Sequence, residues 1–120
     1  MSMTSYKISI SDKIISTNKS LCRKCSCRLG SLKDKFEKSL SGIKGLPQVK
    51  KRSVLCIYSY RTKLIDHDNA YVTVKALVDA LKRCKVIIDD DPNHIEGPYF
   101  FQFEVPKNRE RTEITLKELA

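Results

Sequence analysis

Residues 53–91 read SVLCIYSYRTKLIDHDNAYVTVKALVDALKRCKVIIDDD, and this stretch decides the fold. Its first part, Ser53–Tyr60, is β-branched and aromatic, which is typical of a buried strand. From Ala70 to Cys84 the apolar residues recur at helical spacing, at Tyr71, Val74, Val78 and Leu81. A short apolar strand, Val86–Ile88, follows. A strand, a helix and a strand in this order predict a right-handed parallel crossover.

The sequence before this stretch predicts a strand, a loop and a helix. Residues 6–10 alternate between apolar and polar, which indicates a half-buried strand. Residues 11–30 are rich in Ser, Lys, Arg and Cys without periodicity, so we expect a basic loop. A helix is expected to open at Ser31, because the apolar stripe of Leu32, Phe36 and Leu40 follows it, and to end before Gly42.

The sequence after it predicts two more strands. Residues 99–105 and 112–119 alternate, and residues 106–110 between them are typical of a hairpin turn. With 120 residues there is room for one domain, 1–120. The expected class is α/β (α+β): a mixed β-sheet with two main helices packed on it.

The charge balance favours a polyanionic partner. Lys plus Arg number 23 and Asp plus Glu number 14, so the formal net charge is +9, and nucleic acid is the leading candidate. The alternative is a basic protein whose charge only keeps it in solution. No run approaches the roughly 20 apolar residues of a membrane span, and no secretory leader is recognisable, so we expect a cytoplasmic protein.

The carboxylates are few and clustered. Asp66 and Asp68 stand where a strand gives way to a helix, and Asp89, Asp90 and Asp91 follow the expected strand 86–88. In a parallel crossover both clusters would lie at the carboxyl ends of their strands, where such sheets bind ligands. Hard oxygen ligands suit Mg²⁺. The alternatives are a helix N-cap for DHDN and a proline turn for DDDP.

Lys75 follows Asp68 by seven residues, which is nearly two helical turns. If the helix includes Asp68, both side chains face the same way, and the lysine could stabilise charge on a phosphate oxygen. The alternative is a surface pair with Asp79 at i,i+4 spacing.

The run DHDNAYVTVKALVDAL (66–81), followed by KVIIDD (85–90), resembles the RusA family of Holliday-junction resolvases. ISTNK (15–19) is similar to the family's early S-x-N segment, and RTEITL (111–116) to its last strand. The resemblance implies a homodimeric, Mg²⁺-dependent endodeoxyribonuclease that acts in DNA recombination and repair. Such enzymes cut four-way DNA by paired symmetrical nicks and are often carried by phages and prophages.

The resemblance also implies that residues 53–91 form the catalytic core, and it implies roles for single residues. Asp66, Asp68 and Asp90 would be catalytic metal ligands, with Asp89 as a neighbouring ligand. Lys75 would be the catalytic lysine. The three consecutive aspartates leave the register open by one, and Asp90 is favoured because Ile88 then aligns with the last apolar strand residue.

The expected basic loop is the predicted contact to DNA. Its residues would bind backbone phosphates without reading sequence, and they are Lys13, Asn18, Lys19, Arg23, Lys24 and Arg28. The alternative is a solvated loop.

Three of the five cysteines lie in the same loop, at Cys22, Cys25 and Cys27. The C-x2-C spacing is half of a zinc site, but no second half follows, so reduced thiols are the other interpretation. The rival function is a non-catalytic basic DNA-binding protein, with or without a zinc site.

Overall fold

The stretch 53–91 forms the centre of the fold in the computed structural model, which describes residues 4–12, 14 and 25–119. Strand β2 (Ser53–Arg61), helix α2 (His67–Arg83) and strand β3 (Ile95–Glu104) make a crossover in which β2 and β3 pair in parallel. A parallel crossover is therefore present, as predicted, but its second strand is β3 and not the predicted Val86–Ile88.

The sheet has four strands in the order β1-β4-β2-β3. Strands β1 (Ser5–Ile10) and β4 (Arg111–Glu118) are antiparallel to each other, and β4 is antiparallel to β2. The parallel pair and the antiparallel pairs make the sheet mixed, as predicted. β3 has a neighbour on one side only and is an edge strand within the described sheet.

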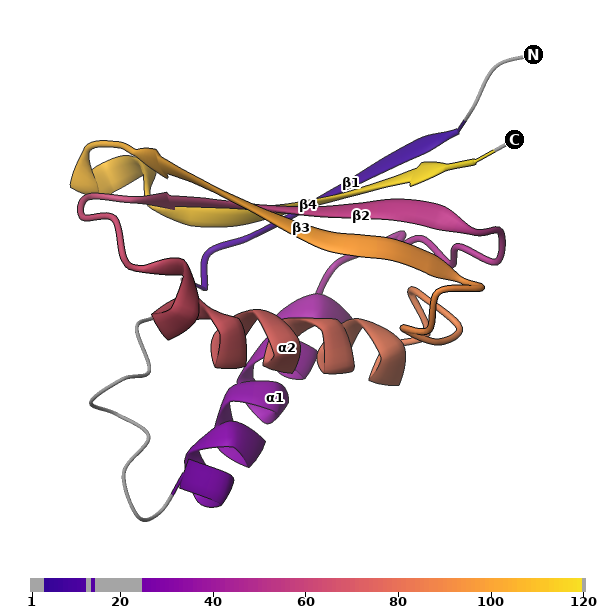
Figure 1. The fold of residues 1–120 in the computed structure, drawn as a ribbon, viewed down its shortest axis with the longest axis horizontal. Helices are drawn as coiled ribbons and strands as arrows, with labels where there is room; N and C mark the ends of the chain where they lie inside the picture. Colours follow the sequence, from indigo (N-terminus) through magenta and orange to yellow (C-terminus); the bar gives the residue numbers. More distant parts are fainter. Residues whose placement is uncertain (1–3, 13, 15–24, 120) are drawn as a thin grey trace.

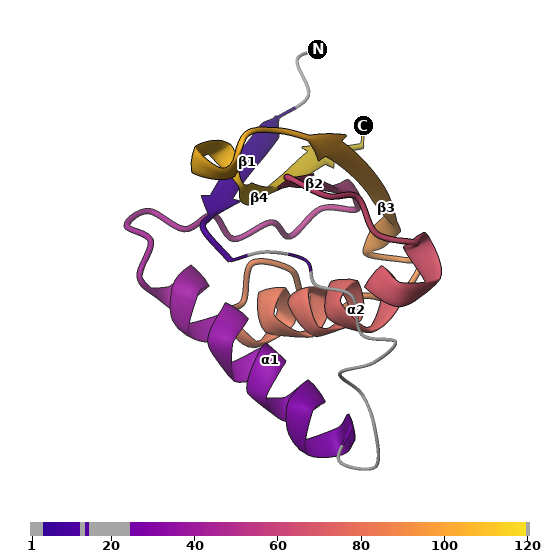
Figure 2. The same cartoon turned by 90° about the vertical axis from the view of Figure 1, so that its left-hand side faces the viewer.

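Helices α1 (Cys25–Ser41) and α2 lie on one face of the sheet, with α2 next to the strands and α1 against α2 (Figures 1 and 2). The core between the layers is apolar and fully buried at Phe36, Leu40, Leu55, Ile57, Leu77 and Ile114. This is the α+β domain of one sheet and two helices that the sequence predicts. Neither described helix is long and apolar enough to cross a membrane.

Helix α1 begins earlier than predicted. The expected start at Ser31 is wrong, because the helix starts at Cys25, and the expected loop over 11–30 is therefore wrong for residues 25–30. Leu29 stands three residues before Leu32, so the apolar spacing already extends one turn further back. Helix α2 likewise begins at His67, one turn before the predicted Ala70.

Val86–Ile88 is not a strand. Ile87 makes only an isolated parallel bridge with Val49, and the Val49 N–H donates to the Val86 carbonyl at 2.7 Å. Val86 and Ile87 are buried in the core while Ile88 is 56% exposed. The apolar run therefore reflects burial of a loop segment, which sequence periodicity over three residues does not distinguish from a strand.

The predicted hairpin at 106–110 is also wrong. β3 and β4 are consecutive in the chain, but β2 lies between them in the sheet. The connection instead contains a short 3-10 helix, η1 (Lys107–Arg109), and crosses the end of β2.

Leu77 tests the packing of α2 on the sheet. Leu77→Ala removes a fully buried side chain, so we expect it to lower the free energy of unfolding by about 2–5 kcal/mol. Urea unfolding followed by circular dichroism measures the change. Lys35→Ala, on the exposed side of α1, is the control and should stay within about 0.5 kcal/mol. Equal effects of the two changes would contradict this packing.

Candidate active site

Asp66 is the N-cap residue of α2, but its side chain does not cap the helix. Its carbonyl accepts the first helical bond, from the Ala70 N–H at 3.1 Å, but its side chain makes no cap hydrogen bond. The carboxylate is exposed, so it remains available to a ligand. Asp68 belongs to α2 by its backbone, as the predicted alignment with Lys75 requires, while its side chain lies outside the described residues.

The segment that leads to Asp66 is held by Gln102 on β3. The Ile65 N–H donates to Gln102 Oε1 at 2.9 Å, and Gln102 Nε2 donates to the Ile65 carbonyl at 2.6 Å. At the start of the same segment, Glu110 Oε2 accepts from the Thr62 N–H and hydroxyl at 3.0 and 3.1 Å. Gln102 and Glu110 thus fix the path of the chain between β2 and α2.

Sequence analysis missed Gln102. Alternation places it on the face of β3 opposite to Tyr99, Phe101 and Phe103, and the structure shows that this is the side of the helices. A polar side chain on that side needs a hydrogen-bonding partner, and the backbone of Ile65 supplies it.

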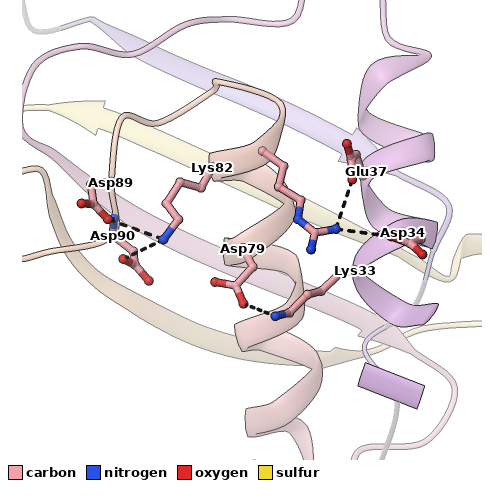
Figure 3. A network of polar contacts seen from close by, with 8 residues as sticks. Lys33, Asp34, Glu37, Asp79, Lys82, Asp89 and Asp90 are labelled. Carbon is pink, nitrogen blue, oxygen red and sulfur yellow. Dashed lines mark hydrogen bonds and ion pairs between the residues drawn. The ribbon is translucent and has the colours of Figure 1, made fainter. Parts of the chain in front are cut away.

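Asp89 and Asp90 lie beyond the other end of α2, where both contact Lys82 (Figure 3). Lys82 Nζ is 3.6 Å from Asp89 and 3.5 Å from Asp90. The Asp90 N–H donates to Asp89 Oδ1 at 2.8 Å, and this bond is the main reason that the pKa of Asp89 is lowered. The charge of Asp90 in turn raises the pKa of Lys82. One lysine therefore contacts both carboxylates.

Asp91 has a structural role. Its carboxylate contacts His94 Nδ1 at 2.6 Å and accepts from the His94 N–H at 3.1 Å, and its carbonyl accepts from the His94 and Ile95 N–H groups. These bonds build the turn into β3, as the proline-turn interpretation of DDDP predicts. Of the three aspartates, Asp89 and Asp90 are the ones left for a ligand.

The two carboxylate clusters do not lie at one sheet edge, and that expectation is wrong. Asp66 follows the carboxyl end of β2, but Asp89 and Asp90 precede the amino end of β3, because the chain returns there before the parallel strand starts. Between them runs α2, whose 17 residues span about 25 Å at 1.5 Å per residue. Ligands of one Mg²⁺ lie within about 2.1 Å of the ion. Among the side chains described, no three His, Cys, Asp or Glu are grouped to hold a metal.

Lys75 and Asp90 line the same cavity. The cavity has a volume of about 540 Å³, lies between α2 and β3, and is lined by Tyr71, Val74, Lys75, Val78, Asp90, Pro98 and Phe100. The surface pair of Lys75 with Asp79 is not formed, since Asp79 binds Lys33 of α1 at 3.0 Å (Figure 3). Among the described residues, this apolar cavity with one cation and one carboxylate most resembles a ligand-binding site.

The predicted DNA-binding and zinc residues are outside this description. Six of them lie outside the described residues: Lys13, Asn18, Lys19, Cys22, Arg23 and Lys24. The structure describes only the backbone, in α1, of the other three: Cys25, Cys27 and Arg28. Both hypotheses stay predictions.

No family model matches the chain, and no curated protein is significantly similar to it in sequence.

Gln102→Leu tests how the Asp66 segment is held. Leucine keeps the size but removes both bonds to Ile65, so we expect faster amide exchange at Ile65 and a loss of about 1–3 kcal/mol in the free energy of unfolding. Hydrogen exchange and urea unfolding measure these effects. Gln48→Leu, at an exposed position, is the matched control and should change neither. An unchanged exchange rate at Ile65 would show that Gln102 does not hold this segment.

Proposed function

We propose that this chain is a Mg²⁺-dependent endonuclease that cuts four-way DNA junctions as a homodimer, by hydrolysis of phosphodiester bonds. The proposal follows the resemblance of residues 66–90 to RusA-family resolvases. It includes the cytoplasm of a bacterial or phage-infected cell as the place of action, and the family's role in recombination and repair.

The cavity between α2 and β3 is the observation that carries the proposal. Lys75 and Asp90 both line it, and they are the lysine and one of the three carboxylates that the resemblance selects. Asp66, whose carboxylate is not used for capping, supports the same assignment. In this site Lys75 would stabilise the negative charge that develops on the phosphate oxygen during cleavage.

A single chain does not complete the carboxylate set, because Asp66 and Asp90 flank opposite ends of α2. A two-fold axis near the middle of α2 would set two copies of the helix antiparallel. The start of one α2 would then lie beside the end of the other, and Asp66 and Asp68 of one copy would meet Asp90 of its partner. The dimer would thereby supply two equivalent sites, as paired nicks require.

The surface around the cavity suits such a dimer. Tyr71 is 67% exposed on α2, Pro98 lies on β3, and β3 is one of the two edge strands of the described sheet. A second copy would cover this apolar surface. When bound across the two copies, Mg²⁺ would supply an activated water and neutralise charge on the scissile phosphate.

The alternative is a non-catalytic DNA-binding protein with the same basic charge. If the chain is a monomer, the distance between Asp66 and Asp90 within one chain favours this non-catalytic function. Cleavage of a synthetic four-way junction in Mg²⁺ separates the two functions.

Mixing two inactive variants tests the site directly. We expect Asp66→Asn and Asp90→Asn each to abolish junction cleavage and to leave junction binding intact, as should Asp68→Asn. When Asp66→Asn and Asp90→Asn proteins are mixed and allowed to exchange subunits, about half of the dimers contain both chains. Each such dimer has one intact site, so about a quarter of the wild-type sites should return.

The same mixture also shows whether the shared site is wrong. If the carboxylates act within one chain, both chains of the mixed dimer are defective and no cleavage returns. Light scattering on the wild type should give the mass of a dimer at micromolar concentration, and a monomer that cleaves junctions would overturn the shared site.

Lys75→Ala tests the cation in the cavity. We expect a loss of about 10²-fold or more in the single-turnover rate, measured with junction binding saturated, because the lysine would act on the transition state. Lys35→Ala, exposed on α1, is the control for the loss of one positive charge. A near-normal rate for Lys75→Ala would leave this lysine a role in phosphate affinity only.

A further inference from the structure

The open face of the sheet, on the side away from both helices, carries five aromatic side chains. Tyr58 and Tyr60 come from β2, and Tyr99, Phe101 and Phe103 from β3; we call them the aromatic cluster. The register places Tyr58 opposite Phe101 and Tyr60 opposite Phe103. Tyr99, Phe101 and Phe103 are 45%, 43% and 45% exposed, and no described helix covers them (Figure 2).

Four of these rings form a continuous stack. Ring centroids are 5.4 Å apart for Tyr58 and Phe101, 6.2 Å for Tyr58 and Phe103, and 5.2 Å for Tyr60 and Phe103. The interplanar angles are 19–25°. The Arg111 guanidinium closes the stack, 4.0 Å from the Tyr60 centroid. Because the rings hold one another in place, binding to them costs little additional side-chain entropy.

Positive charge borders the aromatic cluster. Arg111 and Lys7 both bind Glu113, at 2.8 and 3.4 Å, so two cations face one carboxylate. Burial raises the pKa of Glu113, but the bond from Arg111 and the charge of Lys7 outweigh it and lower the pKa overall. Lys117 is exposed on the same face of β4, and Lys107 and Arg109 are exposed on η1.

The charge decides what can cover this face. Two copies packed face to face would bring Lys7, Arg111 and Lys117 of each toward those of the other, and every copy carries a formal charge of +9. A polyanion with flat apolar groups is complementary instead. Unpaired nucleotides fit this description, whereas paired bases in a duplex keep their faces stacked inside the helix.

We propose that the open face of the sheet binds single-stranded nucleic acid, with bases stacked on the aromatic cluster and phosphates held by the flanking Lys and Arg side chains. Base–aromatic stacking of this kind does not depend on sequence. The surface is separate from the cavity with Lys75 and Asp90, which lies on the helix side of the sheet. The inference therefore goes beyond the proposed nuclease and does not rest on it.

Binding of a labelled 15-nucleotide oligothymidine, followed by fluorescence anisotropy in EDTA, tests the proposal. We expect micromolar or tighter binding by the wild type. Phe101→Leu/Phe103→Leu keeps two apolar side chains but removes their aromatic faces, and should raise Kd at least about tenfold. Both positions are exposed, so the variant should fold, and its thermal unfolding is measured alongside. A matching oligouridine shows whether DNA or RNA is preferred.

Two further variants sharpen the test. The chain contains no Trp, so Phe101→Trp introduces a single reporter that keeps a stacking surface; its emission should be quenched by the oligonucleotide. Lys7→Gln, next to the cluster, should weaken binding at low salt and reduce its salt dependence. Lys44→Gln, which removes the same charge from an exposed loop, is the matched control and should have no such effect.

Three results would overturn the proposal. These are no binding by the wild type, unchanged affinity of the folded Phe101→Leu/Phe103→Leu variant, or a change of that variant from dimer to monomer in light scattering. The last result would make this face an interface between copies. This binding assay contains neither metal nor a DNA junction. Its result is therefore independent of the cleavage experiments that test the proposed nuclease.

Discussion

The parallel pairing of β2 with β3 is the constraint on which the rest of the structure depends. A chain that leaves the carboxyl end of β2 must return to the opposite end before β3 can begin, and α2 provides that return. The helix therefore runs the length of the sheet and separates Asp66 from Asp90. Lys75, near its middle, is left facing the space beside β3. The pairing of β2 with β3 thus determines the core and also the positions of Asp66, Lys75 and Asp90 relative to α2.

The position of α1 rests on burial more than on its ion pairs. Lys33 reaches Asp79, and Arg83 reaches Asp34 and Glu37, but most of these side chains are well exposed (Figure 3). Exposed pairs each contribute about 0–1 kcal/mol. Phe36 and Leu40 are fully buried against the core and carry the larger share.

Features that depend on local periodicity could be predicted from the sequence. The strand at 6–10, the strand at 53–60 and the helix at 70–84 each repeat a pattern over several residues, and all three are present within a turn of the predicted bounds. Strand order could not be predicted, because nothing in residues 99–119 indicates that β2 inserts between β3 and β4. Candidate site residues could be selected from the sequence by their chemical type. The distance between Asp66 and Asp90 could not be predicted, because it depends on where β3 begins.

Alternation along β3 gives neighbouring residues opposite roles. Phe100 lines the cavity beside α2, while Phe101 belongs to the aromatic cluster on the open face. Gln102 again faces inward and Phe103 outward. A one-residue shift in the pairing of β3 would exchange these roles, so the register of one edge strand controls both surfaces.

The pairing of β1 with β4 has a consequence for how the chain reaches this fold. The Tyr6 hydroxyl donates to Glu118, 112 positions along the chain, at 2.8 Å. Contacts this distant in sequence are formed late and slow folding, since a long loop must close first. During synthesis β2 has one bare edge until Arg111–Glu118 has been made, and unpaired edges invite association with other chains. Until β4 has been made, the nascent chain is therefore open to misassembly along this edge of β2.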